Sequence, residues 1–132
     1  MTEDVRAALC ALDRPSWREI EPALEAVYGL GARIFPEALT VYPTLRGWRD
    51  RAALVFAALS FAKSDGDAVR LGVMALDDKS GRVRAHACML LGLSRRKDVV
   101  PALEALLSHR SGETRDHAAR AIDDIRSGRK RV

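Results

Sequence analysis

Similar segments recur along this chain at intervals of a little over thirty residues. Residues 83–92 and 114–123 share a frame of an apolar or small residue, then Arg, then Ala four positions after the start, then two apolar positions seven and eight after it. The same frame fits from Trp48 and more loosely from Trp17, so the starts lie 31, 35 and 31 residues apart. A period of this length is typical of solenoids built by stacking one small structural unit.

A second apolar segment precedes each of these frames. Residues 67–76 lie 31 positions before residues 98–107, with their apolar positions in step. Residues 35–39 repeat the theme with Pro36 in a first helical turn, where its missing N–H costs nothing. Each unit is therefore predicted to be a pair of helices.

Turn-forming residues separate the predicted helices, and the loops are short enough to make neighbouring helices antiparallel. We expect one domain over residues 1–132, with a basic tail at 127–132. The four expected units are 3–29, 33–62, 66–93 and 97–126, and their helices are 3–12 with 16–29, 33–42 with 47–62, 66–77 with 82–93, and 97–108 with 113–126.

Composition agrees with an all-α protein that folds on its own. Apolar residues make up 48% and charged residues 30%, while Ala, Leu and Arg, the strongest helix formers, recur throughout. Charged side chains interrupt every apolar run, and the start of the chain lacks a secretory pattern. Cys10 and Cys88 lie in separate helical patterns and are expected as reduced thiols, which favours a cytoplasmic location.

The second segment of the third unit carries the clearest family pattern. Asp78 stands near the turn, followed by Val83-Arg84 and by small or apolar residues at Ala87, Leu91 and Gly92. This resembles the HEAT-repeat family, particularly its short bacterial form found in bilin (phycobilisome) lyases, and the resemblance is good from about residue 33 to 126. It implies a right-handed α-solenoid of about four helix pairs, and it specifies architecture far more than function.

The frame assigns a buried layer between successive units. Small residues at one position let helix axes approach, and apolar residues at two further positions fill the space between them. The expected members are Ala52, Ala87 and Ala118 for close approach, with Val55, Leu90 and Ala121 and then Phe56, Leu91 and Ile122 as the filling.

An arginine stands at the second position of every frame: Arg18, Arg49, Arg84 and Arg115. Such a ladder could contact phosphates. The family resemblance implies a structural role instead, in which this Arg braces the turn between helices through acidic groups and carbonyls, with Asp50, Asp78 or Glu113 as candidate partners.

A candidate partner-binding face lies two residues further along each frame. Arg51, His86 and His117 share this column, and Met89 and Arg120 follow one turn later on the same side. The loop residues Arg95, Arg96 and Lys97 form a candidate basic rim. Ordinary solvated helix surface is the competing interpretation of both groups.

Motifs for catalysis, metal ligation or nucleotide binding are missing from the sequence. His109 and His117 lack Cys or carboxylate ligands at suitable spacing, and there is no nucleophile elbow or phosphate-binding loop. We therefore expect no enzyme activity, no metal and no cofactor.

The function that these observations favour is a protein-binding module, an adaptor, regulator or immunity-like scaffold. Nucleic-acid binding is the alternative, because residues 41–97 carry 11 basic and 5 acidic side chains. A chromophore-handling role, as in bilin lyases, rests on the repeat resemblance alone. The oligomeric state stays open.

Overall fold

The computed structural model describes residues 2–10 and 17–128, and within these ranges it contains α-helices and short 3-10 segments but no strand. The α-helices are α1 (Thr2–Cys10), α2 (Trp17–Leu30), α3 (Phe35–Val41), α4 (Trp48–Ala58), α5 (Gly66–Ala75), α6 (Gly81–Ser94), α7 (Val100–Glu104) and α8 (Gly112–Ser127). The 3-10 segments are η1 (Gly31–Ile34), η2 (Tyr42–Thr44), η3 (Leu59–Phe61), η4 (Lys97–Val99) and η5 (Ala105–Ser108). The prediction of an all-α fold is confirmed.

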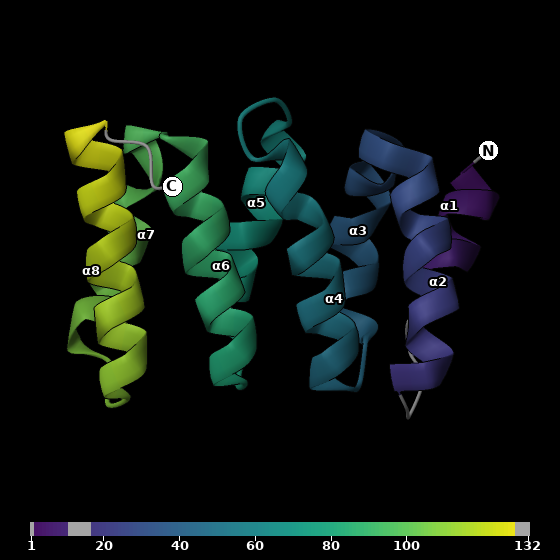
Figure 1. Cartoon of the computed structure of the whole chain (residues 1–132), viewed down its shortest axis with the longest axis horizontal. Coiled ribbons are helices and arrows are strands. Elements are labelled where there is room, and N and C mark those ends of the chain that lie inside the picture. The colour runs from purple at the N-terminus through teal and green to yellow at the C-terminus, as the bar shows by residue number, and fades with distance from the viewer. Residues whose placement is uncertain (1, 11–16, 129–132) are drawn as a thin grey trace.

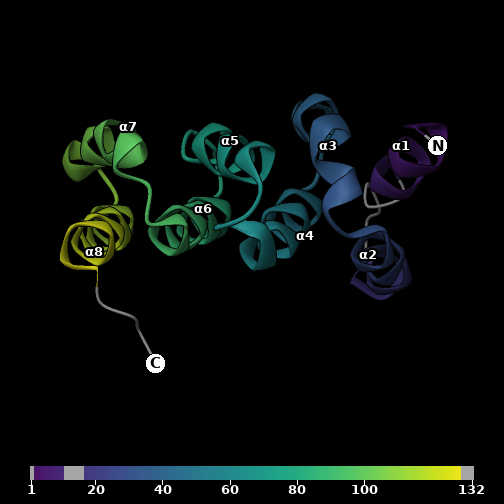
Figure 2. The same ribbon diagram turned by 90° about the horizontal axis from the view of Figure 1, so that it is seen from above.

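The helices form two layers that run side by side along the molecule. Seen from above, α1, α3, α5 and α7 make one row and α2, α4, α6 and α8 the other (Figure 2). In the second row α4 packs on α2, α6 on α4, and α8 on α6, so the chain advances from α1 at one end to α8 at the other (Figure 1). This is the predicted α-solenoid.

The N-terminal caps of the second-row helices define the repeat. Ser80 and Ser111 precede α6 and α8, and their hydroxyls accept hydrogen bonds from the backbone N–H of Val83 and Thr114. Gly47 occupies the same place before α4, without a side chain to cap it. Gly47 and Ser80 are 33 residues apart, and Ser80 and Ser111 are 31 apart, so the predicted interval of 35 is wrong by two.

This shift of two residues changes which side chains of α4 belong to the layer between units. Two residues correspond to about 200° around a helix, so the predicted core residue Phe56 points away from the core and is 48% exposed. Its place is taken by Ala58, which is fully buried and is equivalent to Leu91 and Ile122. The predicted Ala52 and Val55 are nevertheless buried, because α4 is surrounded by α2, α5 and α6.

The core is one continuous apolar cluster that extends from Val5 in α1 to Ile125 in α8. Small residues bring the helices together at two places. A Cβ added at Gly72 of α5 would lie 2.6 Å from Cδ2 of the fully buried Leu90, and one added at Gly92 of α6 would lie 3.4 Å from Cα of Ala121 in α8. The close packing of α5 on α6 thus depends on Gly72, whereas a Cβ at Gly92 would make ordinary van der Waals contact with α8.

Candidate functional site

An arginine four residues after each cap ties its helix to the loop before it. The guanidinium Nη1 of Arg51 and of Arg84 donates to the carbonyl oxygens five and six residues earlier, at 2.8–3.0 Å. Arg115 donates in the same way to the carbonyl six residues earlier, at 2.6 Å. Arg84 also reaches the next unit, where its Nε lies 3.0 Å from Oγ1 of Thr114. These three arginines are structural braces.

The brace of the second unit was predicted at Arg49, and this is wrong because of the same two-residue shift. Arg49 is exposed, and its guanidinium lies over the Trp48 ring at 4.9 Å from the ring centre. Arg51, which was predicted as a partner-binding residue, holds the brace position instead. Arg18, the fourth predicted brace, has an exposed side chain on α2.

Arg51 also joins two units through Asp78. Its Nε and Nη2 lie 2.8 and 3.2 Å from the carboxylate oxygens of Asp78, which also accepts hydrogen bonds from the Tyr42 hydroxyl and from the backbone N–H of Ser80. Burial alone would raise the pKa of Asp78, but the bonds from Arg51, Tyr42 and Ser80 outweigh it and hold that pKa below its usual value. Burial and the Asp78 carboxylate raise the pKa of Tyr42. The cluster locks the second unit onto the third.

The outward surface of the second row, which we call the second-helix face, carries exposed large apolar side chains on neighbouring helices. Phe56 of α4 is 48% exposed, and Met89 and Leu93 of α6 are 53% and 40% exposed. His86 lies between the two helices with its ring centre 5.6 Å from that of Phe56. Burial lowers the pKa of His86, a hydrogen bond with the backbone of Ala52 opposes this, and the charge of Arg82 lowers it further.

A groove of about 320 Å³ lies between α6 and α8 on this face. It brings together four of the predicted partner-binding residues, Met89, Arg95, His117 and Arg120. His86 lies outside it, one turn before Met89. The complete lining is Ala85, Cys88, Met89, Gly92, Leu93, Arg95, His117, Arg120, Ala121 and Asp124.

The predicted basic rim does not form one patch. Arg95 has a left-handed backbone conformation, with φ of 59°, and its Nη1 donates to the carbonyl of Asp124 in α8 at 3.1 Å. Arg96 turns to the other layer and pairs with Asp98 at 2.6 Å, which raises the pKa of Arg96 and lowers that of Asp98. Lys97 is exposed at the start of η4. The three side chains therefore lie in three different environments.

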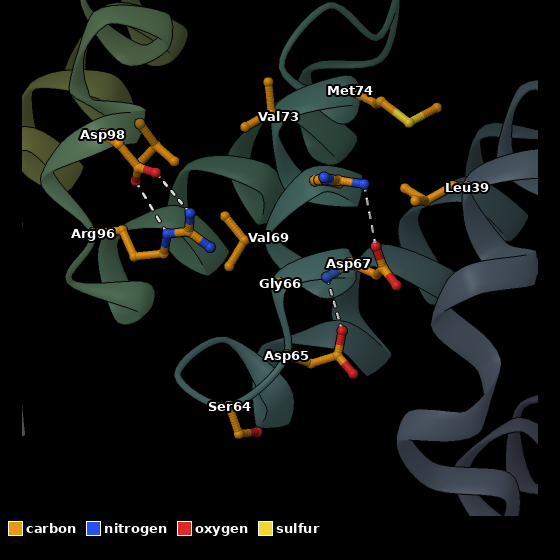
Figure 3. Close-up of a pocket in the computed structure, with 12 residues that line it drawn as sticks. Leu39, Ser64, Asp65, Gly66, Asp67, Val69, Val73, Met74, Arg96 and Asp98 are labelled. Carbon is orange, nitrogen blue, oxygen red and sulfur yellow. Dashed lines mark hydrogen bonds and ion pairs between the residues drawn. The ribbon is translucent and has the colours of Figure 1, made fainter.

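A larger hollow, of about 880 Å³, opens on the first-row side between α3, α5 and η4. Figure 3 shows Arg96 held by Asp98 at one wall and Asp65 folded onto the start of α5 at another. Asp67 pairs with Arg70 at 3.7 Å. The charged side chains around this hollow thus contact one another or, for Asp65, backbone N–H groups, whereas the second-helix face presents apolar side chains to solvent.

Sequence reasoning missed Phe56 and Leu93 as members of the exposed face. The frame had placed Phe56 in the core, and nothing in it marked Leu93 as exposed. The capping serines, Ser80 and Ser111, are the signal that would have found Phe56, since aligning Gly47 with them gives Phe56, Met89 and Arg120 one shared position.

Residues 2–10 and 17–128 contain no group of three or more His, Cys, Asp or Glu placed to hold a metal ion. Within the same ranges, no helix has the length and apolar character needed to cross a membrane.

Comparison with known proteins finds one repeat family over part of the chain. Residues 70–131, which include most of α5 and all of α6, α7 and α8, match the family model of HEAT repeats. No curated protein and no solved structure matches the chain. HEAT repeats generally serve as scaffolds for protein–protein interaction and are typically non-catalytic. Over residues 70–131, the stacked helix pairs and this match together identify HEAT repeats.

Proposed function

We propose that this chain is a non-catalytic protein-binding module, an adaptor or regulatory scaffold, and that its partner docks on the second-helix face. The observation that carries the proposal is the group of exposed apolar side chains Phe56, Met89 and Leu93 on adjacent helices. Contiguous exposed apolar side chains rimmed by polar ones mark interaction surfaces, because leaving them in water is unfavourable.

The rigidity of the helices beneath this surface supports the proposal. Arg51 and Arg84 fix the N-terminal ends of α4 and α6, and Arg95 ties the C-terminal end of α6 to α8. A surface whose backbone is already fixed loses less conformational entropy on binding than a mobile one does. The exposed anchors are thus held ready for a partner.

Contacts made by several arginines argue against the alternative function, nucleic-acid binding. Arg51, Arg84 and Arg96, which supply part of the basic middle segment, spend their guanidinium donors on Asp78, loop carbonyls and Asp98. A phosphate ladder needs cations that face outward in register.

The free thiols of Cys10 and Cys88 are in keeping with a cytoplasmic location for the module.

Site-specific photo-crosslinking tests this function. A photo-reactive phenylalanine analogue replaces Met89 or Phe56 on the second-helix face, and Leu107 in η5 serves as a control because it is also exposed, at 43%. We expect discrete protein adducts in cells from the first two positions and not from Leu107. Adducts from Leu107 alone, or adducts that contain only nucleic acid, contradict the proposal.

A further inference from the structure

We propose that the groove between α6 and α8 receives an acidic amphipathic helix of about two turns from the partner. This inference rests on the proposed function and deepens it, because it names the chemistry of the segment that docks. Three properties of the groove carry it: its apolar anchor points, its length and the balance of charge in its lining.

The apolar part of the groove matches the side chains of a docking helix. Met89 and Leu93 stand one turn apart on α6 and are both strongly exposed. Small residues, Ala85, Gly92 and Ala121, form the remaining apolar lining with the buried Cys88. Small lining residues beside two long apolar side chains leave room for inserted side chains, which a helix supplies at i, i+3 or i+4, and i+7.

The length of the groove sets the length of its occupant. Its lining on α6 extends from Ala85 to Leu93, and on α8 from His117 to Asp124. Eight residues of helix correspond to roughly 12 Å at about 1.5 Å per residue. A helix laid along the groove is therefore contacted over about two turns.

The charge of the lining favours carboxylates on the occupant. The lining contains two arginines, Arg95 and Arg120, against a single carboxylate, Asp124. Arg82, which is exposed, adds positive charge beside His86 just before the groove begins. Complementary potentials across an interface raise the association rate and select the partner. An acidic helix meets this surface with its apolar stripe on Met89 and Leu93 and its carboxylates toward Arg82 and Arg120.

Selection from a random library tests the inference without knowledge of the partner. A displayed library of 16-residue peptides is enriched on the full chain, on Met89→Glu and on the control Leu107→Glu. Met89 and Leu107 are both exposed, so neither change needs to disturb the core, and circular dichroism checks that both variants fold. We expect wild type and Leu107→Glu to enrich acidic peptides with Leu, Ile or Phe three or four residues apart, and Met89→Glu to reduce that enrichment at least tenfold.

Direct binding then separates the contribution of charge. The most enriched peptide and its copy with every Asp and Glu changed to Lys are titrated by fluorescence anisotropy into wild type and Arg120→Glu. We expect the acidic peptide to bind wild type at least tenfold more tightly than the Lys copy does, and Arg120→Glu to narrow that ratio by at least threefold. A mixed-sequence DNA duplex is titrated in parallel.

The possible failures are distinguishable. Peptides that depend on Met89 but are neutral or basic overturn the inference and leave the second-helix face in place as a docking surface. Three other results overturn the inference: enrichment that is unchanged by Met89→Glu, no enrichment at all, and tighter binding of the DNA duplex than of any peptide. Site-specific crosslinking then decides separately whether the face binds protein.

Discussion

Asp78 joins the second unit to the third through several hydrogen bonds. Its carboxylate accepts hydrogen bonds from Arg51 and Tyr42 of the second unit and from the backbone of Ser80, while its own carbonyl accepts one from Arg84. Its side chain is only 4% exposed. A buried carboxylate with this many donors stabilises the fold as an anion, and removing its charge leaves the donors of Arg51 poorly satisfied.

Replacing Asp78 by Asn tests this cluster. We expect Asp78→Asn to lower the free energy of unfolding at pH 7 by about 2 kcal/mol, because a buried charge-assisted hydrogen-bond network is broken. Asp77→Asn, at the neighbouring exposed position, serves as the control and should change it by less than about 0.5 kcal/mol. Urea denaturation measures both.

The stability difference between wild type and Asp78→Asn should depend on pH with a definite sign. The pKa of Asp78 is lower in the folded state than its usual value, so its contribution is fully present above the unfolded pKa of about 3.9. That contribution is lost as pH falls through the folded pKa. The stability difference between wild type and Asp78→Asn should therefore stay constant from about pH 6 to 8 and shrink below about pH 4. A difference that grows on acidification contradicts this account.

The register of the arginine braces is testable by substitution of Arg84 and Arg49. Arg84→Met removes hydrogen bonds to two loop carbonyls and to Thr114, and should cost about 1.5–3 kcal/mol of unfolding free energy. Arg49→Met removes one exposed contact with the Trp48 ring and should cost no more than about 1 kcal/mol. Equal losses in urea denaturation would mean that Arg49 is a brace after all.

At the scale of the helices, periodicity alone predicted the helical elements and their order along the chain. The first helix of the last unit was expected as one helix over 97–108, but it is η4, α7 and η5 in succession. Pro101, at the start of α7, lacks the N–H that would continue a helix through it. Such an interruption follows from a missing backbone donor and is not visible in an apolar pattern.

The frame misplaced α4 because Trp48 resembles the apolar start of the other frames. Gly47 provides no capping side chain, so the second unit offered no local mark of its helix start, unlike Ser80 and Ser111. The frames that begin at Val83 and Thr114 are in the observed register. The predicted fold is still correct because α4 is buried on several sides, but the exposed side of α4 was assigned to the wrong residues.

Leu91 and Phe56 were predicted to hold equivalent positions in the core. The observed register instead predicts that their substitution by Ala lowers the stability by different amounts. Leu91 is fully buried between α6 and its neighbours, so Leu91→Ala should cost about 2–5 kcal/mol. Phe56 is 48% exposed, so Phe56→Ala should cost less than about 1.5 kcal/mol while removing an apolar anchor of the second-helix face. Thermal unfolding followed by circular dichroism compares the two, and similar losses would contradict the corrected register.

At the scale of the molecule, the two rows of helices present different surfaces. The first row bears a hollow whose charged residues pair with one another, Arg96 with Asp98 and Arg70 with Asp67. The second row presents Phe56, Met89 and Leu93 beside basic and histidine side chains. The sequence placed Met89, His117 and Arg120 on one face because helical periodicity holds within each helix. It could not show that Arg95 turns to this face and Arg96 away from it, since both lie in a loop whose path follows from tertiary contacts.

Amide chemical-shift mapping shows whether the partner docks on the second-helix face. The ¹⁵N-labelled chain is titrated with the partner protein recovered by crosslinking at Met89, and the shifted amides are assigned to the helices. We expect the largest shifts to cluster in α4, α6 and α8 around Phe56, Met89 and His117. Shifts concentrated instead in α3, α5 and α7, around the hollow lined by Val69 and Val73, would contradict it.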